Sequence, residues 1–251
     1  MAYTYDFKVV VSGKQVEVFK YKKQVWRDFE ATEREAQREP KQLNFFEAEQ
    51  LKKQRMKFSI NRTKTEIRRL VNSNPQLNKF MTLTFAENIT DLKTANYIFN
   101  KFVLRMSYQH PDFQYLAVPE FQKRGAVHYH LLCNLPFVTI GRLQAIWGQG
   151  FIKINKIDSV NNVGAYMSKY LGKELDERTF GKKKYFRSQN LKEAVELLGW
   201  LALRFFEKFL SFLTPVFEKF FKSEWVGEVE YSAYTLDYIP FAKGYSPPFR
   251  F

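Results

Sequence analysis

Residues 116–134 read LAVPEFQKRGAVHYHLLCN, in which two apolar segments flank the turn sequence 123–125. This pattern predicts a β-hairpin. Two of the chain's three histidines, His128 and His130, lie one residue apart in the second segment. Residues two apart on a strand point to the same face, so we expect both imidazoles on one face of the hairpin.

The length of the turn decides which side chain faces these imidazoles. A three-residue loop with Gly125 in the left-handed conformation pairs Glu120 with His128. A two-residue loop would shift the register by one residue and would move Glu120 to the opposite face. We expect the three-residue loop, in which Glu120, His128 and His130 converge.

Two imidazoles and one carboxylate leave coordination positions open for water or for substrate oxygens. Such a group suits a divalent cation that polarises a phosphate. The simpler alternative is a partly exposed strand whose histidines are solvated or satisfied within the core. Residues further along the chain are needed to choose between these interpretations.

A second polar cluster is predicted in the segment 166–173, which reads YMSKYLGK and follows Asp158 and Ser159, two possible helix caps. In a helix, two tyrosines and two lysines of this segment share one stripe: Tyr166, Lys169, Tyr170 and Lys173. Tyrosines at this spacing are often packing residues, but lysines beside both favour a chemical role. A tyrosine hydroxyl can attack a phosphodiester, and neighbouring cations favour the phenolate. Two tyrosines permit two successive transesterifications.

Three motifs of the chain resemble those of the HUH endonucleases, in particular the two-tyrosine rolling-circle replication initiators of bacterial plasmids and single-stranded DNA phages. The motifs are FMTLTF at 80–85, His-Tyr-His at 128–130 with Glu120 ahead of it, and Tyr-x-x-Lys-Tyr-x-x-Lys at 166–173. The resemblance covers residues 80 to about 190. It implies nicking of single-stranded or cruciform DNA at a replication origin, with Mg²⁺ or Mn²⁺, and strand rejoining at termination.

The resemblance also implies a role for each residue. The cation would be held by Glu120, His128 and His130. The nucleophiles that form a 5′-phosphotyrosine would be Tyr166 and Tyr170, and Lys169 and Lys173 would stabilise charge or position the phosphate.

The composition also indicates a nucleic-acid partner, because 40 Lys and Arg against 26 Asp and Glu give a net charge of +14, and 18% of the residues are aromatic. Cations release counterions from phosphates, and exposed rings stack on unpaired bases. The alternative is a solvated basic surface over a core filled by rings. The candidate DNA contacts lie before the core, in the hairpin turn and after the tyrosines: Arg62, Lys64, Arg68, Arg69, Lys123, Arg124, Lys182, Lys183, Lys184, Tyr185 and Arg187.

Apolar periodicity predicts an α+β fold whose core has the order β-α-β-β-α-β, which is the ferredoxin-like or RRM-like arrangement around an antiparallel sheet. We divide the chain into an N-terminal hairpin and basic helical extension (1–79), a nuclease core (80–190) and a C-terminal region (191–251). Residues 191–224 are predicted to form one or two amphipathic helices, the second starting near 214–215. These helices would cover the sheet or form an oligomer contact, and a strand is predicted over 228–239.

Several features concern the surroundings of the protein. The single cysteine, Cys133, fits a reducing compartment and is expected to be a core residue. No signal peptide is apparent, and charges interrupt the apolar segment 197–213, so we expect a cytoplasmic protein without a membrane partner. The sequence contains no G-x-x-x-x-G-K-[ST] phosphate loop, so strand separation is expected to require a host helicase and replication machinery.

Two other functions are compatible with parts of these patterns. A transposase or a mobilisation relaxase uses the same chemistry on a different DNA target. A non-catalytic RRM-like module would stack bases on sheet rings and would need no metal. The combination of His-x-His with the doubled Tyr-x-x-Lys argues against the module.

Overall fold

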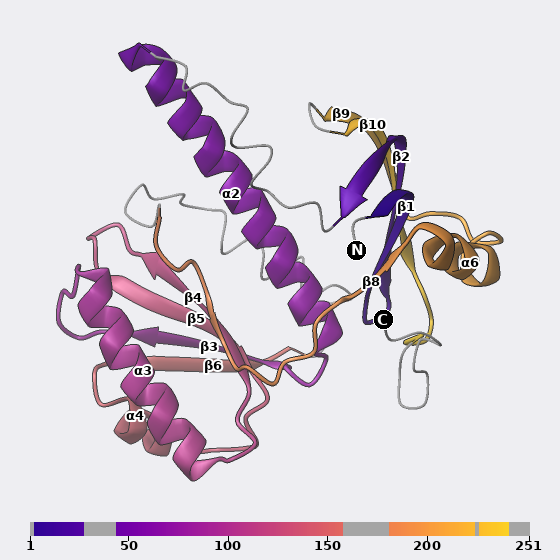
Figure 1. The fold of residues 1–251 in the computed structure, drawn as a ribbon. Coiled ribbons are helices and arrows are strands. Elements are labelled where there is room, and N and C mark those ends of the chain that lie inside the picture. Colours follow the sequence, from indigo (N-terminus) through magenta and orange to yellow (C-terminus); the bar gives the residue numbers. More distant parts are fainter. Residues whose placement is uncertain (1–2, 28–43, 158–180, 224–225, 241–251) are drawn as a thin grey trace. The chain divides into compact units, whose positions relative to one another are not determined.

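The computed structural model describes residues 3–27, 44–157, 181–223 and 226–240 (Figure 1). The chain forms two compact units, of which unit 1 contains residues 1–51 and 193–251 and unit 2 contains residues 52–192. Each unit is built on one five-stranded antiparallel sheet with helices, so the predicted α+β class is confirmed. The three-part division made from the sequence stays a prediction.

Unit 2 contains the predicted β-α-β-β-α-β order, and its strands are arranged β6-β3-β5-β4-β7. The central strand is therefore β5, which carries both histidines of the hairpin. The elements are β3 (Lys79–Thr84), α3 (Leu92–Gln109), β4 (Tyr115–Phe121), β5 (Val127–Cys133), α4 (Ile140–Trp147), β6 (Ile152–Lys156) and β7 (Phe186–Arg187).

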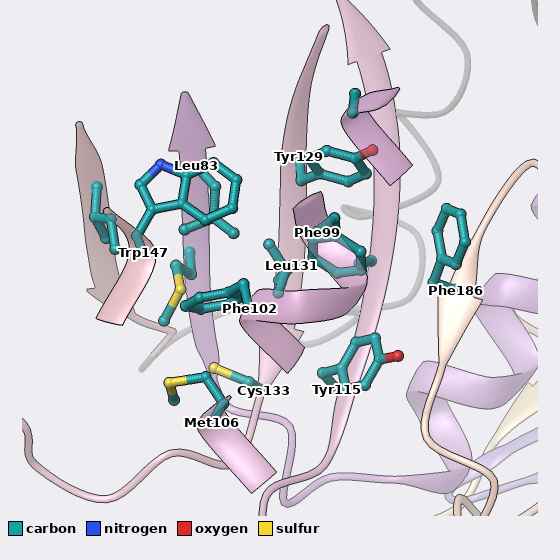
Figure 2. Packing of buried hydrophobic residues seen from close by; sticks show 14 of the residues in the cluster. Leu83, Phe99, Phe102, Met106, Tyr115, Tyr129, Leu131, Cys133, Trp147 and Phe186 are labelled. Atoms are coloured by element: carbon teal, nitrogen blue, oxygen red, sulfur yellow. The ribbon is translucent and has the colours of Figure 1, made fainter. Parts of the chain in front are cut away.

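Helices α3 and α4 pack on one face of this sheet and form the main core (Figure 2). The α3 helix starts where Asp91 Oδ2 accepts a hydrogen bond from the Thr94 backbone N–H at 2.8 Å. Its predicted apolar stripe is buried, and Phe99 stacks on Tyr129 of β5 with ring centroids 4.3 Å apart. Cys133 is fully buried in the same core, as predicted. This packing fixes the central strand, and with it the positions of the residues on its opposite face.

Helix α2 (Phe45–Ser73) begins with a reciprocal cap between Asn44 and Glu47. Near its end, Ile67 and Leu70 are buried against Leu116, Val118 and Leu132 on the other face of the unit 2 sheet. The prediction that the basic helix buries these two positions is therefore confirmed. The described helices, this 29-residue one included, contain no span that is long and apolar enough to cross a membrane.

Unit 1 begins with the predicted N-terminal hairpin, and its strands are arranged β8-β1-β2-β10-β9. Its core consists of valines of β1 and β2, packed under Ala202 and Phe205 of the single described helix. The elements are β1 (Tyr3–Ser12), β2 (Gln15–Arg27), β8 (Val195–Leu198), α6 (Gly199–Phe209), β9 (Phe217–Ser223) and β10 (Gly227–Thr235).

The C-terminal region corrects the prediction of helices through residue 224. Only α6 is helical in the described part of that range, whereas β8 precedes it and β9 occupies the place of the second helix. The strand forms because residues 217–223 pair with β10, and the Val216 N–H donates to the Ala233 carbonyl at 2.8 Å. The predicted final strand is confirmed as β10.

Candidate metal centre

The turn between β4 and β5 sets the register of the site. Gly125 has φ 87°, and the Gln122 N–H donates to the Ala126 carbonyl at 2.8 Å. Glu120 consequently pairs with His128, and Val118 pairs with His130. The predicted three-residue loop is confirmed, and the shifted register of a two-residue loop is excluded.

The three predicted metal ligands converge on one face of the sheet. Glu120 Oε2 lies 3.0 Å from His128 Nε2 and 2.5 Å from His130 Nε2. All three side chains are largely withdrawn from solvent, with 20%, 14% and 9% of their respective surfaces exposed. The ligand atoms of the group lie within 4.8 Å of one another, so they can contact a single ion.

The donor set fits a six-coordinate divalent cation. Metal–oxygen distances near 2.1 Å in an octahedral site place adjacent ligand atoms about 3.0 Å apart. The two measured separations of 3.0 and 2.5 Å are close to this value, so little rearrangement is needed to admit an ion. Three ligands on one side leave the remaining positions for water and phosphate oxygens. Imidazole ligands favour Mn²⁺ over Mg²⁺, which prefers an all-oxygen shell.

Two side chains that sequence reasoning missed hold the imidazoles in this orientation. Thr82 Oγ1 lies 3.2 Å from His130 Nδ1, and Gln122 Nε2 lies 3.4 Å from His128 Nδ1. Phe80 also stacks on the His130 ring, with centroids 5.5 Å apart. Groups that occupy Nδ1 leave Nε2 directed at the metal position, as is usual for a metal-bound histidine.

The Glu120 carboxylate is ionised in this environment. Burial raises its pKa, but hydrogen bonds and favourable charge interactions with His128 and His130 outweigh burial and lower the pKa to about 2. A metal ligand must be deprotonated to bind, so the carboxylate is ready to coordinate a cation across the physiological pH range.

Strand β6 adds a cation and an aromatic ring to the same face. Lys153 pairs with Thr82, which itself pairs with His130, so the three residues form one row across the sheet. The row spans about 10 Å from β6 to β5, a distance that a lysine side chain can partly bridge. Phe151, two residues earlier, is 60% exposed, and its carbonyl accepts hydrogen bonds from Thr84. The alternation within strand 151–157 could have placed them on one face, but not beside Thr82.

The candidate DNA contacts in the hairpin turn lie next to the centre. Lys123 and Arg124 are exposed. Arg124 donates to the Gln122 side chain at 2.9 Å and to the Phe85 carbonyl at 3.2 Å. Since Gln122 also approaches His128, the turn and the centre share one hydrogen-bonded network.

Two other groups of candidate DNA contacts come together in space. The Lys184 ammonium donates to Ser59 of α2, and its pKa is lowered by burial and by the nearby Arg62. Lys183 lies over the Phe186 ring, 4.9 Å from its centroid, and Lys182 is exposed. The remaining candidates are partly buried: Lys64, Arg68 and Arg69 on α2, Tyr185 against the apolar cluster under α2, and Arg187 in β7.

The tyrosine motif cannot be placed relative to this centre. Tyr166, Lys169, Tyr170 and Lys173 lie outside the described residues. Their roles stay predictions.

Comparison with known proteins identifies the same part of the chain. Residues 78–175 match a family of replication-associated proteins, the ORF2 type. The matched range contains the complete Glu120, His128 and His130 group and the tyrosine motif. Searches of the curated proteins and of the solved structures found no match. The family match supports a role in replication.

Proposed function

We propose that the protein initiates rolling-circle replication by nicking single-stranded origin DNA and rejoining strands at termination. The observation that carries this proposal is the convergence of Glu120, His128 and His130 within the segment that matches a replication-associated family. A cation held by these three residues would polarise the scissile phosphate. The donor set supports Mn²⁺ or Mg²⁺ as that cation.

The chemical step that we propose is a transesterification. The phenolate oxygen of Tyr166 or Tyr170 attacks phosphorus, a new P–O bond forms to the tyrosine, and the bond to the 3′ oxygen breaks. The products are a 5′-phosphotyrosine and a strand with a 3′ hydroxyl, which takes up a proton. The second tyrosine permits a second cleavage while the first product stays linked, as termination requires. Lys169 and Lys173 would stabilise charge during these steps.

The charge of unit 2 favours a nucleic-acid substrate. Residues 52–192 contain 25 of the 40 Lys and Arg but only 9 of the 26 Asp and Glu, a net charge of +16. Lys153 and the exposed Phe151 ring lie on the face that carries the metal ligands, where they can hold a phosphate and stack on a base. The basic cluster of Lys182, Lys183 and Lys184 extends this surface.

The alternatives predict different behaviour. A non-catalytic RRM-like module has no need for two imidazoles and a carboxylate directed at one point. A transposase or relaxase would share the chemistry, and the replication-associated match favours an initiator over both.

The direct test is incubation with a labelled single-stranded origin library and Mn²⁺, followed by denaturing electrophoresis and mass spectrometry of the peptides that contain the two tyrosines. We expect a 5′-phosphate linked to Tyr166 or Tyr170 and a loss of cleavage with a chelator. The double variant Tyr166→Phe/Tyr170→Phe should bind DNA but form no adduct.

Matched histidine variants test the metal centre in the same assay. His128→Ala should lower cleavage about 10³-fold, because several kcal/mol of transition-state stabilisation are lost. His110→Ala removes the one histidine outside the centre and should leave cleavage intact. Binding without an adduct across an adequate library would instead favour the RRM-like module.

A further inference from the structure

Strand β9 is an unpaired edge with an apolar surface. Among the described residues it has a hydrogen-bonded neighbour on one side only, β10, at the margin of the unit 1 sheet (Figure 1). Three of its seven residues are phenylalanines, and Phe217, Phe220 and Phe221 are 54%, 75% and 40% exposed. An exposed edge of this kind offers free backbone groups to another strand.

The sequence of β9 identifies its partner as a second copy of the same strand. We propose that the protein forms a symmetric dimer in which β9 pairs antiparallel with β9 of another copy, with Phe220 on the two-fold axis. This register places Glu218 opposite Lys222 of the other copy, and by symmetry Lys222 opposite Glu218. Opposite charges stabilise directly facing positions of an antiparallel pair. The two Phe220 rings lie between these charge pairs on the same face.

The other face of the paired strands is also compatible with this register. Lys219 lies opposite Phe221 of the second copy, where an ammonium can contact a ring. Phe217 lies diagonally from the same Phe221, within reach of an aromatic side chain. No like charges face each other in this arrangement.

Neighbouring registers are less favourable. Centring the axis on Lys219 places two lysines directly opposite each other. Centring it between Phe220 and Phe221 places Lys219 opposite Lys222 twice. Centring it between Lys219 and Phe220 leaves both charge types opposite rings. The register centred on Phe220 therefore contains two attractive pairs and no repulsive one.

The charge of unit 1 favours a protein partner over nucleic acid. Residues 1–51 and 193–251 contain 15 Lys and Arg and 17 Asp and Glu, a net charge of −2, although the whole chain carries +14. Such a unit does not attract phosphates, and it does not repel another copy of itself strongly. Symmetric pairing of one patch with itself is the commonest form of dimer.

The test is the molar mass of the full chain, measured by sedimentation equilibrium over a range of concentrations. We expect a reversible dimer of a 29.9 kDa monomer. Glu218→Lys should weaken dimerisation about 10- to 100-fold, because both symmetric pairs become repulsive. Phe220→Asp should weaken it in a similar way. Both positions are exposed, so thermal unfolding of each variant should match the wild type.

A mixing experiment tests the register itself. Lys222→Glu alone should also be monomeric, but its mixture with Glu218→Lys should form a heterodimer in which both charge pairs are restored. Lys14→Glu is the matched control, because it reverses an exposed charge of unit 1 away from β9 and should not alter dimerisation. A wild type that stays monomeric at high concentration, a dimer that resists Glu218→Lys and Phe220→Asp, or the absence of the heterodimer would overturn the proposal.

Discussion

Unit 1 and unit 2 each contain five antiparallel strands, but they expose different chemistry at different positions of the sheet. In unit 2 the polar residues lie on the central strand β5, where both neighbours and the packed core fix the side chains. In unit 1 the central strands are filled with valine, and the exposed rings lie on the edge strand β9. A central strand suits a preorganised metal site, whereas an edge suits recognition of another strand.

The two units also hold their partly buried carboxylates differently. Glu196 of unit 1 contacts Lys8 at 2.6 Å and Arg27 at 3.0 Å. Burial raises the pKa of Glu196, but these two cations lower it overall. The side chains that contact the Glu120 carboxylate of unit 2 are imidazoles, which can exchange a proton for a metal ion. The comparison separates a structural ion pair from a group suited to bind a cation.

The largest expected effect concerns the acid stability of unit 2 in chelator-treated protein. The folded-state pKa of Glu120 is about 2, below its usual value of 4.5. Ionised Glu120 therefore stabilises the fold above pH 4.5, and this stabilisation, about 3 kcal/mol, is lost as the pH falls toward 2. Glu120→Gln should remove this part of the pH dependence, measured by hydrogen exchange of β5 amides.

Glu87→Gln provides the control, because this exposed residue of unit 2 lies outside the metal centre. It should leave the acid dependence of β5 unchanged. If Glu120→Gln kept the wild-type dependence between pH 4.5 and 2, Glu120 would not differ from an ordinary surface carboxylate, and the contrast with Glu196 would fail.

A smaller effect is expected at the hydroxyl that orients His130. Thr82→Val removes the Thr82 Oγ1 contact with Nδ1 while keeping the shape of the side chain, and should weaken Mn²⁺ binding about 10- to 100-fold. Titration calorimetry or the EPR signal of free Mn²⁺ measures this change without DNA. Thr82→Ser should restore binding.

Thr84→Val is the matched variant for this experiment. Thr84 lies two residues along the same face, but its hydroxyl donates to the Phe151 carbonyl rather than to an imidazole. Equal losses from Thr82→Val and Thr84→Val would mean that the strand, and not the hydroxyl on His130, determines affinity.

The parts of the fold that could be predicted are those set by neighbouring residues. Gly125 fixed the hairpin register through local turn chemistry, and Asp91 marked the start of α3. The site followed directly, because Glu120, His128 and His130 all belong to that one hairpin.

The parts that could not be predicted depend on residues far apart in the sequence. The segment 217–223 has enough apolar residues for a helix, and it becomes a strand because β10 pairs with it. β8 pairs with β1, about 190 residues earlier, which no local pattern reveals. Likewise, Lys153 and Thr82 become neighbours only through the pairing of β3 with β6.

The smallest expected effect tests whether DNA contacts are confined to unit 2. Binding of single-stranded DNA to chelator-treated protein should weaken with salt, and each phosphate contact contributes about 0.7 to the slope of log affinity against log salt. Lys153→Gln should reduce this slope by about that amount, which corresponds to about a 2.5-fold smaller loss of affinity for a fourfold rise in salt. Fluorescence anisotropy at several salt concentrations measures it. Lys14→Gln removes an exposed charge from unit 1 and should leave the slope unchanged. An equal decrease for both variants would mean that unit 1 contacts DNA despite its net charge of −2, and the division of roles between the two sheets would be lost.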